Sequence, residues 1–235
     1  MNTSAIPRGK DSDIPSDPAV REALSWTQSA RFLTTASLLS QLPGSDLPEV
    51  AFVGRSNAGK STAINTLAQH RRLAFASKTP GRTQHINLFD LGPMGAPDGR
   101  WADLPGYGYA AVPAAARAHW HELVGGYLRT RACLRGVILI MDVRHPLTEL
   151  DRQLLDWLRP TGVPVHVLLS KSDKLGHQQA GTTLRETNAA LARYYVNCSA
   201  QLFSSTHKVG IVEAAKQIQR WLGDARNKEP PVKGD

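Results

Sequence analysis

Short apolar runs alternate with segments of helical periodicity over most of this chain. Six runs have the length and apolar content of strands: residues 49–53, 86–91, 100–102, 137–141, 165–169 and 194–198. Five other segments are predicted to be helices: residues 60–67, 113–131, 150–158, 178–192 and 211–222. This alternation predicts an α/β fold, in which a mostly parallel sheet carries helices on both faces.

Two parts of the pattern sharpen this prediction. Residues 137–141 are continuously apolar, as expected of a central strand that is buried on both faces. The Gly- and Pro-rich segment 92–99 joins two predicted strands by a turn, which favours an antiparallel pair at one edge of the sheet. The predicted fold is therefore a mostly parallel sheet with one antiparallel edge strand.

Both ends of the chain differ from this pattern. Residues 1–20 are polar and contain Pro, Ser and Asp, so we expect a disordered N-terminal arm, and residues 225–235 are expected to form a disordered C-terminal tail. Residues 21–224 contain no internal repeat and no linker, and the chain of 235 residues has the length of one well-cored domain. We therefore expect a single domain between two disordered ends.

Composition excludes several classes of protein. Hydrophobic residues make up 41% of the chain and charged residues 20%, as in an ordinary globular domain. No apolar stretch is long enough to span a bilayer, and the N-terminus lacks the apolar segment of a signal peptide, so we expect a cytoplasmic protein that binds no membrane. We also expect a monomer. Cys133 and Cys198 form no CxxC pair, which argues against a disulfide framework or a zinc site.

The chain is strongly basic, with a net charge of +8 and a pI of about 9.8. Such a charge is typical either of a well-solvated surface or of a protein that binds a polyanion such as RNA. Charge alone does not distinguish RNA from an acidic protein or a membrane surface. The candidate basic contacts, each of which is equally at home on a solvated helix face, are Arg71, Arg72, Arg117, Arg129, Arg131 and Arg135.

Residues 54–61 contain a phosphate-binding motif, GxxxxGK[ST], between a predicted strand and a predicted helix. Glycines let backbone N–H groups turn toward phosphate oxygens, and the helix N-terminus favours negative charge. Lys60 is placed for the β- and γ-phosphates and the Ser61 hydroxyl for Mg²⁺. The alternative, a Gly-rich turn that contains Lys-Ser by chance, is weakened by the strand–loop–helix context. The predicted loop residues are Gly54, Arg55, Ser56, Asn57, Ala58, Gly59, Lys60 and Ser61.

The phosphate loop does not choose the base, but a later segment does. Directly after the predicted strand 165–169 come Ser170, Lys171, Ser172 and Asp173. Ligands of such sheets bind at the carboxyl ends of strands. Asp173 can accept two hydrogen bonds that guanine donates and adenine does not, and the stem of Lys171 can lie along the base. For the tetrapeptide taken alone, a solvated Lys/Asp turn is the alternative.

Two further segments stand in the order that a nucleotide-dependent switch requires. The first consists of Asp103, Leu104, Pro105 and Gly106, after a predicted strand. Asp103 can hold Mg²⁺ through water, and the Gly106 N–H can face the γ-phosphate. The second, residues 79–83, lies between the first helix and the second strand, where the Thr83 hydroxyl can bind Mg²⁺ when the γ-phosphate is present. Each segment alone is a turn, but the four together support one another.

With these motifs the chain resembles the EngB (YihA/YsxC) family of GTPases, in the Era-like class of P-loop G proteins. The resemblance runs from about residue 32 to residue 222 and is carried by RFLT at 31–34, GRSNAGKS at 54–61, TPGRTQ at 79–84, DLPGYGYA at 103–110 and FSS at 203–205, with Lys208 and Gly210 just downstream. The paired signatures TPGRTQ and DLPGYGYA are quite specific. One departure is Ser170, where the family usually has Thr and other G proteins Asn; the hydroxyl is kept.

The resemblance implies a GTPase that binds GTP and GDP, uses one Mg²⁺ and acts with the rRNA and proteins of the large ribosomal subunit during its assembly. It also implies that normal cell division and septation need the protein. It gives the loop of Phe203, Ser204 and Ser205 a base-contacting role. The nucleotide-contacting set then also includes Gly81, Arg82, Gln84 and His85.

Tyr107 occupies the position where many G proteins carry a Gln that orients the attacking water, so we expect slow intrinsic hydrolysis. In related GTPases an Asn at the position of Asn57 helps to bind K⁺ near the phosphates, and we hypothesise the same here. The alternatives are that Asn57 only braces the loop and that the ribosome activates hydrolysis. The residues expected to take part in hydrolysis are Asn57, Lys60, Thr83 and Gly106, and the metal ligands are Ser61, Thr83 and, through water, Asp103.

Two rival functions remain open. The first is an RNA- or ribosome-docking module that is insensitive to nucleotide, which the basic charge alone would allow. The second is a P-loop ATPase or small-molecule kinase, against which the segment 170–173 argues. A metal-dependent hydrolase is remote, because the eight His residues show no HExxH or comparable spacing.

Overall fold

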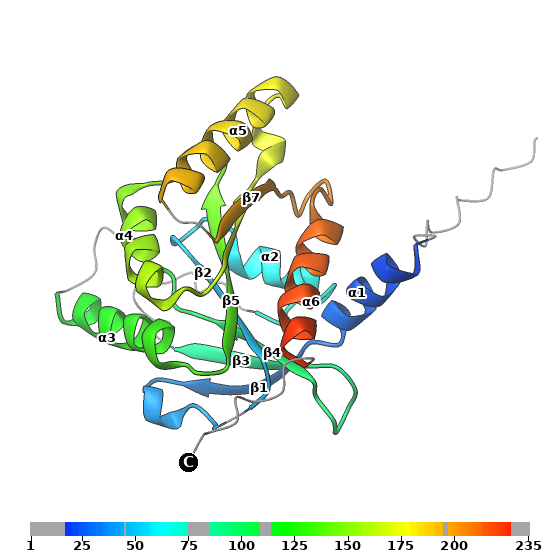
Figure 1. Ribbon diagram of the computed structural model, residues 1–235, viewed down its shortest axis with the longest axis vertical. Coiled ribbons are helices and arrows are strands. Elements are labelled where there is room, and N and C mark those ends of the chain that lie inside the picture. Colours follow the sequence, from blue (N-terminus) through cyan, green and yellow to red (C-terminus); the bar gives the residue numbers. More distant parts are fainter. Residues whose placement is uncertain (1–16, 45, 75–84, 109–113, 195–196, 227–235) are drawn as a thin grey trace, which may run out of the picture.

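The computed structural model describes residues 17–44, 46–74, 85–108, 114–194 and 197–226, which fold around one sheet (Figure 1). The strands are β1 (Arg31–Ala36), β2 (Glu49–Gly54), β3 (Ile86–Leu91), β4 (Gly99–Asp103), β5 (Leu134–Asp142), β6 (Val165–Ser170) and β7 (Cys198–Leu202). The α-helices are α1 (Pro18–Gln28), α2 (Lys60–Leu67), α3 (Ala114–Thr130), α4 (Glu149–Leu158), α5 (His177–Tyr194) and α6 (Ile211–Arg226). Short 3₁₀ turns occupy Leu39–Gln41, Arg159–Thr161 and Ser172–Lys174.

The sheet has the order β1-β3-β4-β2-β5-β6-β7. Neighbours from β4 to β7 pair in parallel, whereas β3 is antiparallel to both β1 and β4. The predicted fold class, a mostly parallel sheet with an antiparallel pair at one edge, is therefore confirmed. The sequence analysis missed β1, which lies outside β3 and forms the edge itself. Because β1 pairs on one side alone and leaves Phe32 and Leu33 exposed, it lacks the apolar run of the inner strands.

Alternating residues of the central strands build two cores. From β5, Val137 and Leu139 face a core covered by α3, α4 and α5, while Ile138 and Ile140 face the core beneath α2 and α6. Helix α1 packs beside α6 and α2 on that second face (Figure 1). This two-sided burial explains the continuous apolar run predicted for a central strand. In the described part of the chain, no helix combines the length and apolarity needed to cross a bilayer.

Helix α1 corrects the predicted N-terminal boundary. The analysis assigned residues 1–20 to a disordered arm, but residues 18–20 already belong to this helix. The Asp17 carboxylate accepts a hydrogen bond of 2.9 Å from Ala19 N, and Pro18 occupies the first turn, where its missing N–H costs nothing. At the other end α6 continues to Arg226, two residues past the predicted boundary. Residues 1–16 and 227–235, the rest of the two predicted ends, lie outside the described residues.

The last strand was predicted four residues too early. The analysis placed it at 194–198, whereas Tyr194 ends α5 and β7 begins at Cys198. In β7 the polar side chains of Ser199 and Gln201 lie 2.8 Å from the two ring nitrogens of His166 in β6. Hydrogen bonds thus replace apolar contacts on one face of this strand, while Cys198, Ala200 and Leu202 pack against the core on the other, so the strand has no continuous apolar run.

Candidate functional site

The predicted phosphate loop connects β2 to α2. A Cβ atom added to Gly54 would lie 2.6 Å from the carbonyl oxygen of Ile140 in β5, so only glycine fits this close approach of two strands. Asn57 (φ 64°) and Gly59 (φ 101°) both adopt left-handed conformations, and Gly59 is the N-cap of α2. The loop therefore bends back over the N-terminus of a helix, where open N–H groups and the helix dipole favour an anion.

The segment that follows β4 lies directly against this loop. Ser56 N donates to Tyr107 O at 2.7 Å, and Tyr107 N donates to Gly54 O at 3.3 Å. A Cβ atom on Gly106 would lie 3.3 Å from Gly54 O, which leaves little room for any side chain. The structure thus brings together two segments that are about fifty positions apart in the sequence and that we predicted to share one ligand.

The charged groups of the loop meet at the end of β4. The Lys60 ammonium forms an ion pair with the Asp103 carboxylate, and their side chains are 12% and 5% exposed. Lys60 lies in the first turn of α2, whose next residue is Ser61. A hydroxyl and a carboxylate are hard oxygen ligands of the kind that Mg²⁺ prefers, so the donors present fit this ion. Among the described residues, no cluster of three His, Cys, Asp or Glu offers another metal site.

The loop also contains a buried hydroxyl that has no partner among the described residues. Ser56 Oγ is buried and neither donates nor accepts a hydrogen bond among these residues. A buried polar atom without a partner costs free energy, and such atoms are rare in folded proteins. The phosphate loop therefore has a polar atom left over for a ligand, in addition to its backbone N–H groups.

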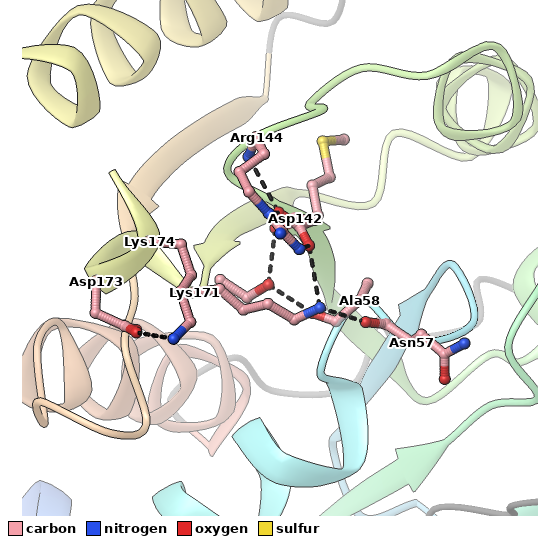
Figure 2. Close-up of polar contacts among 9 residues, drawn as sticks. Asn57, Ala58, Asp142, Arg144, Lys171, Asp173 and Lys174 are labelled. Carbon is pink, nitrogen blue, oxygen red and sulfur yellow. Dashed lines mark hydrogen bonds and ion pairs between the residues drawn. The ribbon is translucent and has the colours of Figure 1, made fainter. Parts of the chain in front are cut away.

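The predicted base-binding segment lies against the other side of the loop (Figure 2). Ser170 Oγ is 2.5 Å from Ala58 O and 3.0 Å from Met141 O, and Lys171 Nζ is 2.6 Å from Asn57 O. This contact with the loop needs a hydrogen-bond donor in the side chain at position 170, and the Ser170 hydroxyl supplies it. Segments at the ends of β2 and β6 form one continuous site.

Asp173 and the loop after β7 lie side by side. Ser204 Oγ donates to Asp173 Oδ1 at 2.6 Å, and the Lys174 ammonium is 3.6 Å from Asp173 Oδ2. The hydrogen bond from Ser204 is the main reason why the pKa of the Asp173 carboxyl lies below its usual value. The backbone holds the two segments together as well, since Ser172 N donates to Phe203 O at 3.1 Å and Phe203 is buried.

Some predicted contacts are placed elsewhere or are not described. Gly81, Arg82, Thr83 and Gln84 lie outside the described residues, so their roles stay predictions. His85 precedes β3, and its Nδ1 is 2.9 Å from Ser37 Oγ; no described contact joins it to the phosphate loop.

Two of the residues after β4 face away from the phosphate loop. Leu104 is fully buried in the core, and the Pro105 carbonyl accepts a hydrogen bond of 2.9 Å from Trp120 Nε1 of α3. The hydroxyl of Tyr107 donates to Asp151 Oδ1 of α4 at 2.5 Å. Burial, followed by the neighbouring Asp151, raises the pKa of the Tyr107 phenol well above its usual value. At the position where many G proteins carry a Gln, this chain therefore has a buried, protonated side chain that is held by a neighbouring helix.

Sequence reasoning missed one residue of this site, Asp142. It ends β5, next to the loop strand β2, and its Oδ2 is 3.0 Å from Lys171 Nζ. A carboxylate at the carboxyl end of a central strand was the available signal, because ligands of such sheets bind at that edge. Its significance depends on Lys171, which a sequence pattern does not connect to it.

Comparisons with known proteins agree with this geometry. Residues 49–171 match the family model MMR_HSR1, described as a 50S ribosome-binding GTPase. A protein from Paraburkholderia phymatum, named probable GTP-binding protein EngB, is 55% identical over 210 residues, which cover 86% of this chain and 96% of that protein. A protein of the same name from Burkholderia thailandensis is 54% identical over 201 residues, which cover 83% of this chain and 92% of that protein.

Solved structures share the fold. The crystal structure of a probable GTP-binding protein engB aligns with a TM-score of 0.58 at 20% identity and covers 75% of this chain and 99% of that chain. A variant of Era from Aquifex aeolicus, bound to GDP and AlF₄⁻, aligns with a TM-score of 0.62 at 19% identity, over 80% of this chain and 60% of that chain. At these identities the likeness concerns the fold alone.

Proposed function

Because this chain belongs to the EngB family of P-loop GTPases, we propose that it is a Mg²⁺-dependent GTP-binding switch that acts in assembly of the large ribosomal subunit. The proposal rests on one observation: two groups of residues suited to bind a nucleotide lie together at the carboxyl ends of the parallel strands. Lys60 and the phosphate loop follow β2. Asp173 follows β6, and Ser204, which is bonded to Asp173, follows β7. The ligand that needs both elements is a guanine nucleotide.

The phosphate loop binds the phosphates through the N–H groups around the α2 N-terminus and through the Lys60 ammonium. Asp173 accepts the two hydrogen bonds of guanine, while the Ser204 hydroxyl holds the carboxylate in place by a hydrogen bond of 2.6 Å. Adenine offers no donor at these positions and would leave the carboxylate unpaired. In this proposal Phe203 and Ser205 complete the base pocket, and the stem of Lys171 lies along the base.

Ser61 and Thr83 would ligate Mg²⁺ directly, and Asp103 would do so through water. The ion supplies positive charge that offsets the charge of the phosphates during their transfer. Lys60 exchanges its partner on binding, because an ammonium that contacts phosphate must draw away from Asp103, with which it is now paired. The freed Asp103 carboxylate is then available for the water shell of the ion.

The switch depends on loss of the γ-phosphate. Thr83 and Gly106 contact the γ-phosphate or its Mg²⁺ in the GTP state, so hydrolysis releases both segments. Intrinsic hydrolysis is slow in this proposal, because the Tyr107 phenol is bonded to Asp151 and does not orient water. Asn57, whose side-chain amide points away from Lys171 in Figure 2, supplies a ligand for K⁺ near the phosphates. Equal GTPase rates in K⁺ and in Na⁺ buffers would exclude this role.

The ribosomal part of the proposal is supported by the description of the matched family as a 50S ribosome-binding GTPase and by the net charge of +8. Arg71, Arg72, Arg129 and Arg135 are exposed and serve as candidate rRNA contacts. Arg131 is withdrawn from that set, because it forms an ion pair of 3.0 Å with the buried Glu49. The side chain of Arg117 lies outside the described residues. We further propose that the protein is a monomer, that it acts in the cytoplasm, and that normal cell division and septation need it.

Calorimetric titration with GDP, GTP and ATP, with and without Mg²⁺, tests the nucleotide part. We expect the wild-type protein to prefer the guanine nucleotides by at least about a hundredfold, and Asp173→Ala to lose that preference while keeping its fold, as judged by circular dichroism. Equal binding of ATP and GTP by the wild-type protein would overturn the proposal and favour a P-loop ATPase.

Co-sedimentation with 50S particles, at increasing salt, tests the ribosomal part. A switch should bind in a manner that differs between GTP and GDP, and the binding should weaken steeply with salt. Binding that is identical with the two nucleotides would favour the rival docking module.

A further inference from the structure

Two consecutive carbonyl groups of the phosphate loop are held from outside by the segment that follows β6. Ser170 Oγ is 2.5 Å from Ala58 O, and Lys171 Nζ is 2.6 Å from Asn57 O (Figure 2). Because a peptide group is planar and trans, a carbonyl held on one side directs the next N–H to the opposite side. The contact with Ala58 O therefore directs the Gly59 N–H away from β6, and the contact with Asn57 O holds the tight turn at the tip of the loop.

Lys171 needs help to hold this position. Its side chain is 33% exposed, and a lysine has a flexible four-carbon stem whose ammonium is strongly hydrated in water. The backbone of Lys171 is itself left-handed, with a φ of 57°, and its ammonium reaches back to the loop at Asn57 O. The second oxygen that the ammonium contacts is Asp142 Oδ2, at 3.0 Å, from the end of β5.

Asp142 is well fixed for this task. Arg144 binds it through Nε at 2.9 Å and through a terminal nitrogen at 2.7 Å, and Arg144 N donates to it at 3.1 Å. These hydrogen bonds, followed by that of Lys171, hold the pKa of the Asp142 carboxyl well below its usual value. The carboxylate is 6% exposed and sits opposite Ser170 in the β5–β6 register. It is therefore an ionised carboxylate, held by several hydrogen bonds, beside a lysine with a flexible stem.

We propose that Asp142 is a positioning residue for nucleotide binding: it holds the Lys171 ammonium on the Asn57 carbonyl and so keeps the phosphate loop in the conformation that receives the phosphates. This inference rests on the nucleotide site proposed above. Asp142 itself acts through Lys171 and the loop, and guanine recognition stays with Asp173 and Ser204.

A purely structural ion pair would behave differently. If Asp142 served only the fold, its Arg144 partner, which is 46% exposed, would satisfy it, and the loss of Asp142 would leave nucleotide release unchanged. The proposal instead requires the effects of Asp142 and Lys171 on the nucleotide to depend on each other. Coupling of two substitutions is the measurable difference.

The experiment follows release of a fluorescent GDP analogue by stopped flow in full-length variants. Asp142→Ala should release the nucleotide about tenfold faster than the wild-type protein, because the ammonium loses its fixed partner. The preference for GDP over ADP should not change. Arg159→Ala, which removes a surface ion pair with Asp156 whose two side chains are 52% and 49% exposed, is the control and should change release by less than about twofold.

A double-mutant cycle decides between the two roles. Lys171→Met should also speed release, and adding Asp142→Ala to it should have no further effect; additive effects would overturn the proposal, as would wild-type release in the single Asp142→Ala variant. Should that variant fail to fold, Asp142→Asn keeps the shape, removes the charge, and should speed release in the same direction. A wild-type protein that binds no GDP would count against the proposed function, whereas unaltered release in the variants counts against this inference alone.

Discussion

The two ends of the proposed nucleotide site are organised in opposite ways. At the base end, Ser204 is already bonded to Asp173 and the Phe203 carbonyl to Ser172 N, and both Phe203 and Ser204 are buried. At the phosphate end, Lys60 is paired with Asp103, and Ser56 Oγ is buried without a partner among the described residues. At the base end the contacts among the side chains are already made. At the phosphate end the ion pair between Lys60 and Asp103 must open before a phosphate takes its place.

This contrast separates two tasks. A preformed base pocket gives selectivity, because a wrong base meets a carboxylate that does not move to suit it. A phosphate end whose ion pair must open couples binding to a change in the segment after β4. Substitutions at the base end should therefore change which nucleotide is bound, and substitutions at the phosphate end should change how tightly any nucleotide is bound.

The largest effect is expected from Lys60→Ala. The variant loses the cation for the phosphates and leaves Asp103 buried without its partner, so GDP and GTP affinity should fall by about a hundredfold or more. Isothermal titration calorimetry measures this change. The matched control is Lys174→Ala, whose exposed ammonium lies 3.6 Å from Asp173 and should matter by less than about twofold. A loss below about tenfold for Lys60→Ala would contradict the division of tasks.

A smaller effect is expected from Ser204→Ala. The variant removes the hydrogen bond that holds the Asp173 carboxylate, and hydrogen bonds to charged groups contribute about 1.5–3 kcal/mol, so GDP affinity should fall by about tenfold to about a hundredfold. ADP affinity should not follow it. The exposed neighbour Thr206 provides the control Thr206→Ala, which should behave as wild type in both titrations. Equal losses for GDP and ADP would place Ser204 outside base recognition.

Tyr107→Phe should affect the fold more than the ligand. The substitution leaves Asp151, which is 2% exposed, with one oxygen unbonded, so the free energy of unfolding should fall by about 1–2 kcal/mol in urea titrations. Tyr194→Phe removes an equivalent bond to Asp156 at the surface and should cost less than about 0.5 kcal/mol. A GDP affinity reduced more than the stability explains would show that Tyr107 also serves the phosphate end.

The smallest effect is that of pH on base selectivity. The hydrogen bond from Ser204 holds the pKa of the Asp173 carboxyl below its usual value, so the carboxylate is ionised at neutral pH, and its contribution is lost only as the pH falls through that lowered pKa. The ratio of GDP to ADP affinity, in which phosphate titration cancels, should therefore stay constant between about pH 5 and about pH 8. A ratio that falls within this window would show that a different group reads the base.

The sequence was most informative where one short segment carries its own context. The loop 54–61 was predicted because a strand must precede it and a helix must follow it, and both could be read from neighbouring residues. Asp173 was predicted from its place after a strand. The base-contacting role of the loop of Phe203, Ser204 and Ser205 was implied by the family resemblance alone, and the hydrogen bond of Ser204 to Asp173 was not predicted, since nothing in a Ser-rich turn points to a carboxylate thirty-one positions away.

Elements that depend on distant partners were missed. Strand β1 is stabilised by pairing with β3, more than fifty positions later, and its exposed side chains leave no apolar run. Asp142 gains its role when β5 and β6 pair in register and bring Lys171 within reach. Strand β7 was displaced because its polar residues bond to His166 rather than enter a core.

The segment after β4, residues 104–107, contacts the phosphate loop and two helices at once. Its backbone is bonded to the phosphate loop through Tyr107, its Pro105 carbonyl to Trp120 of α3, and its phenol to Asp151 of α4. A displacement of this stretch is therefore shared with the outer helical layer. His121 is exposed, and its ring lies against Trp120. The fluorescence of a dye attached at this position would therefore report displacement of the segment at the phosphates, without contact with the nucleotide.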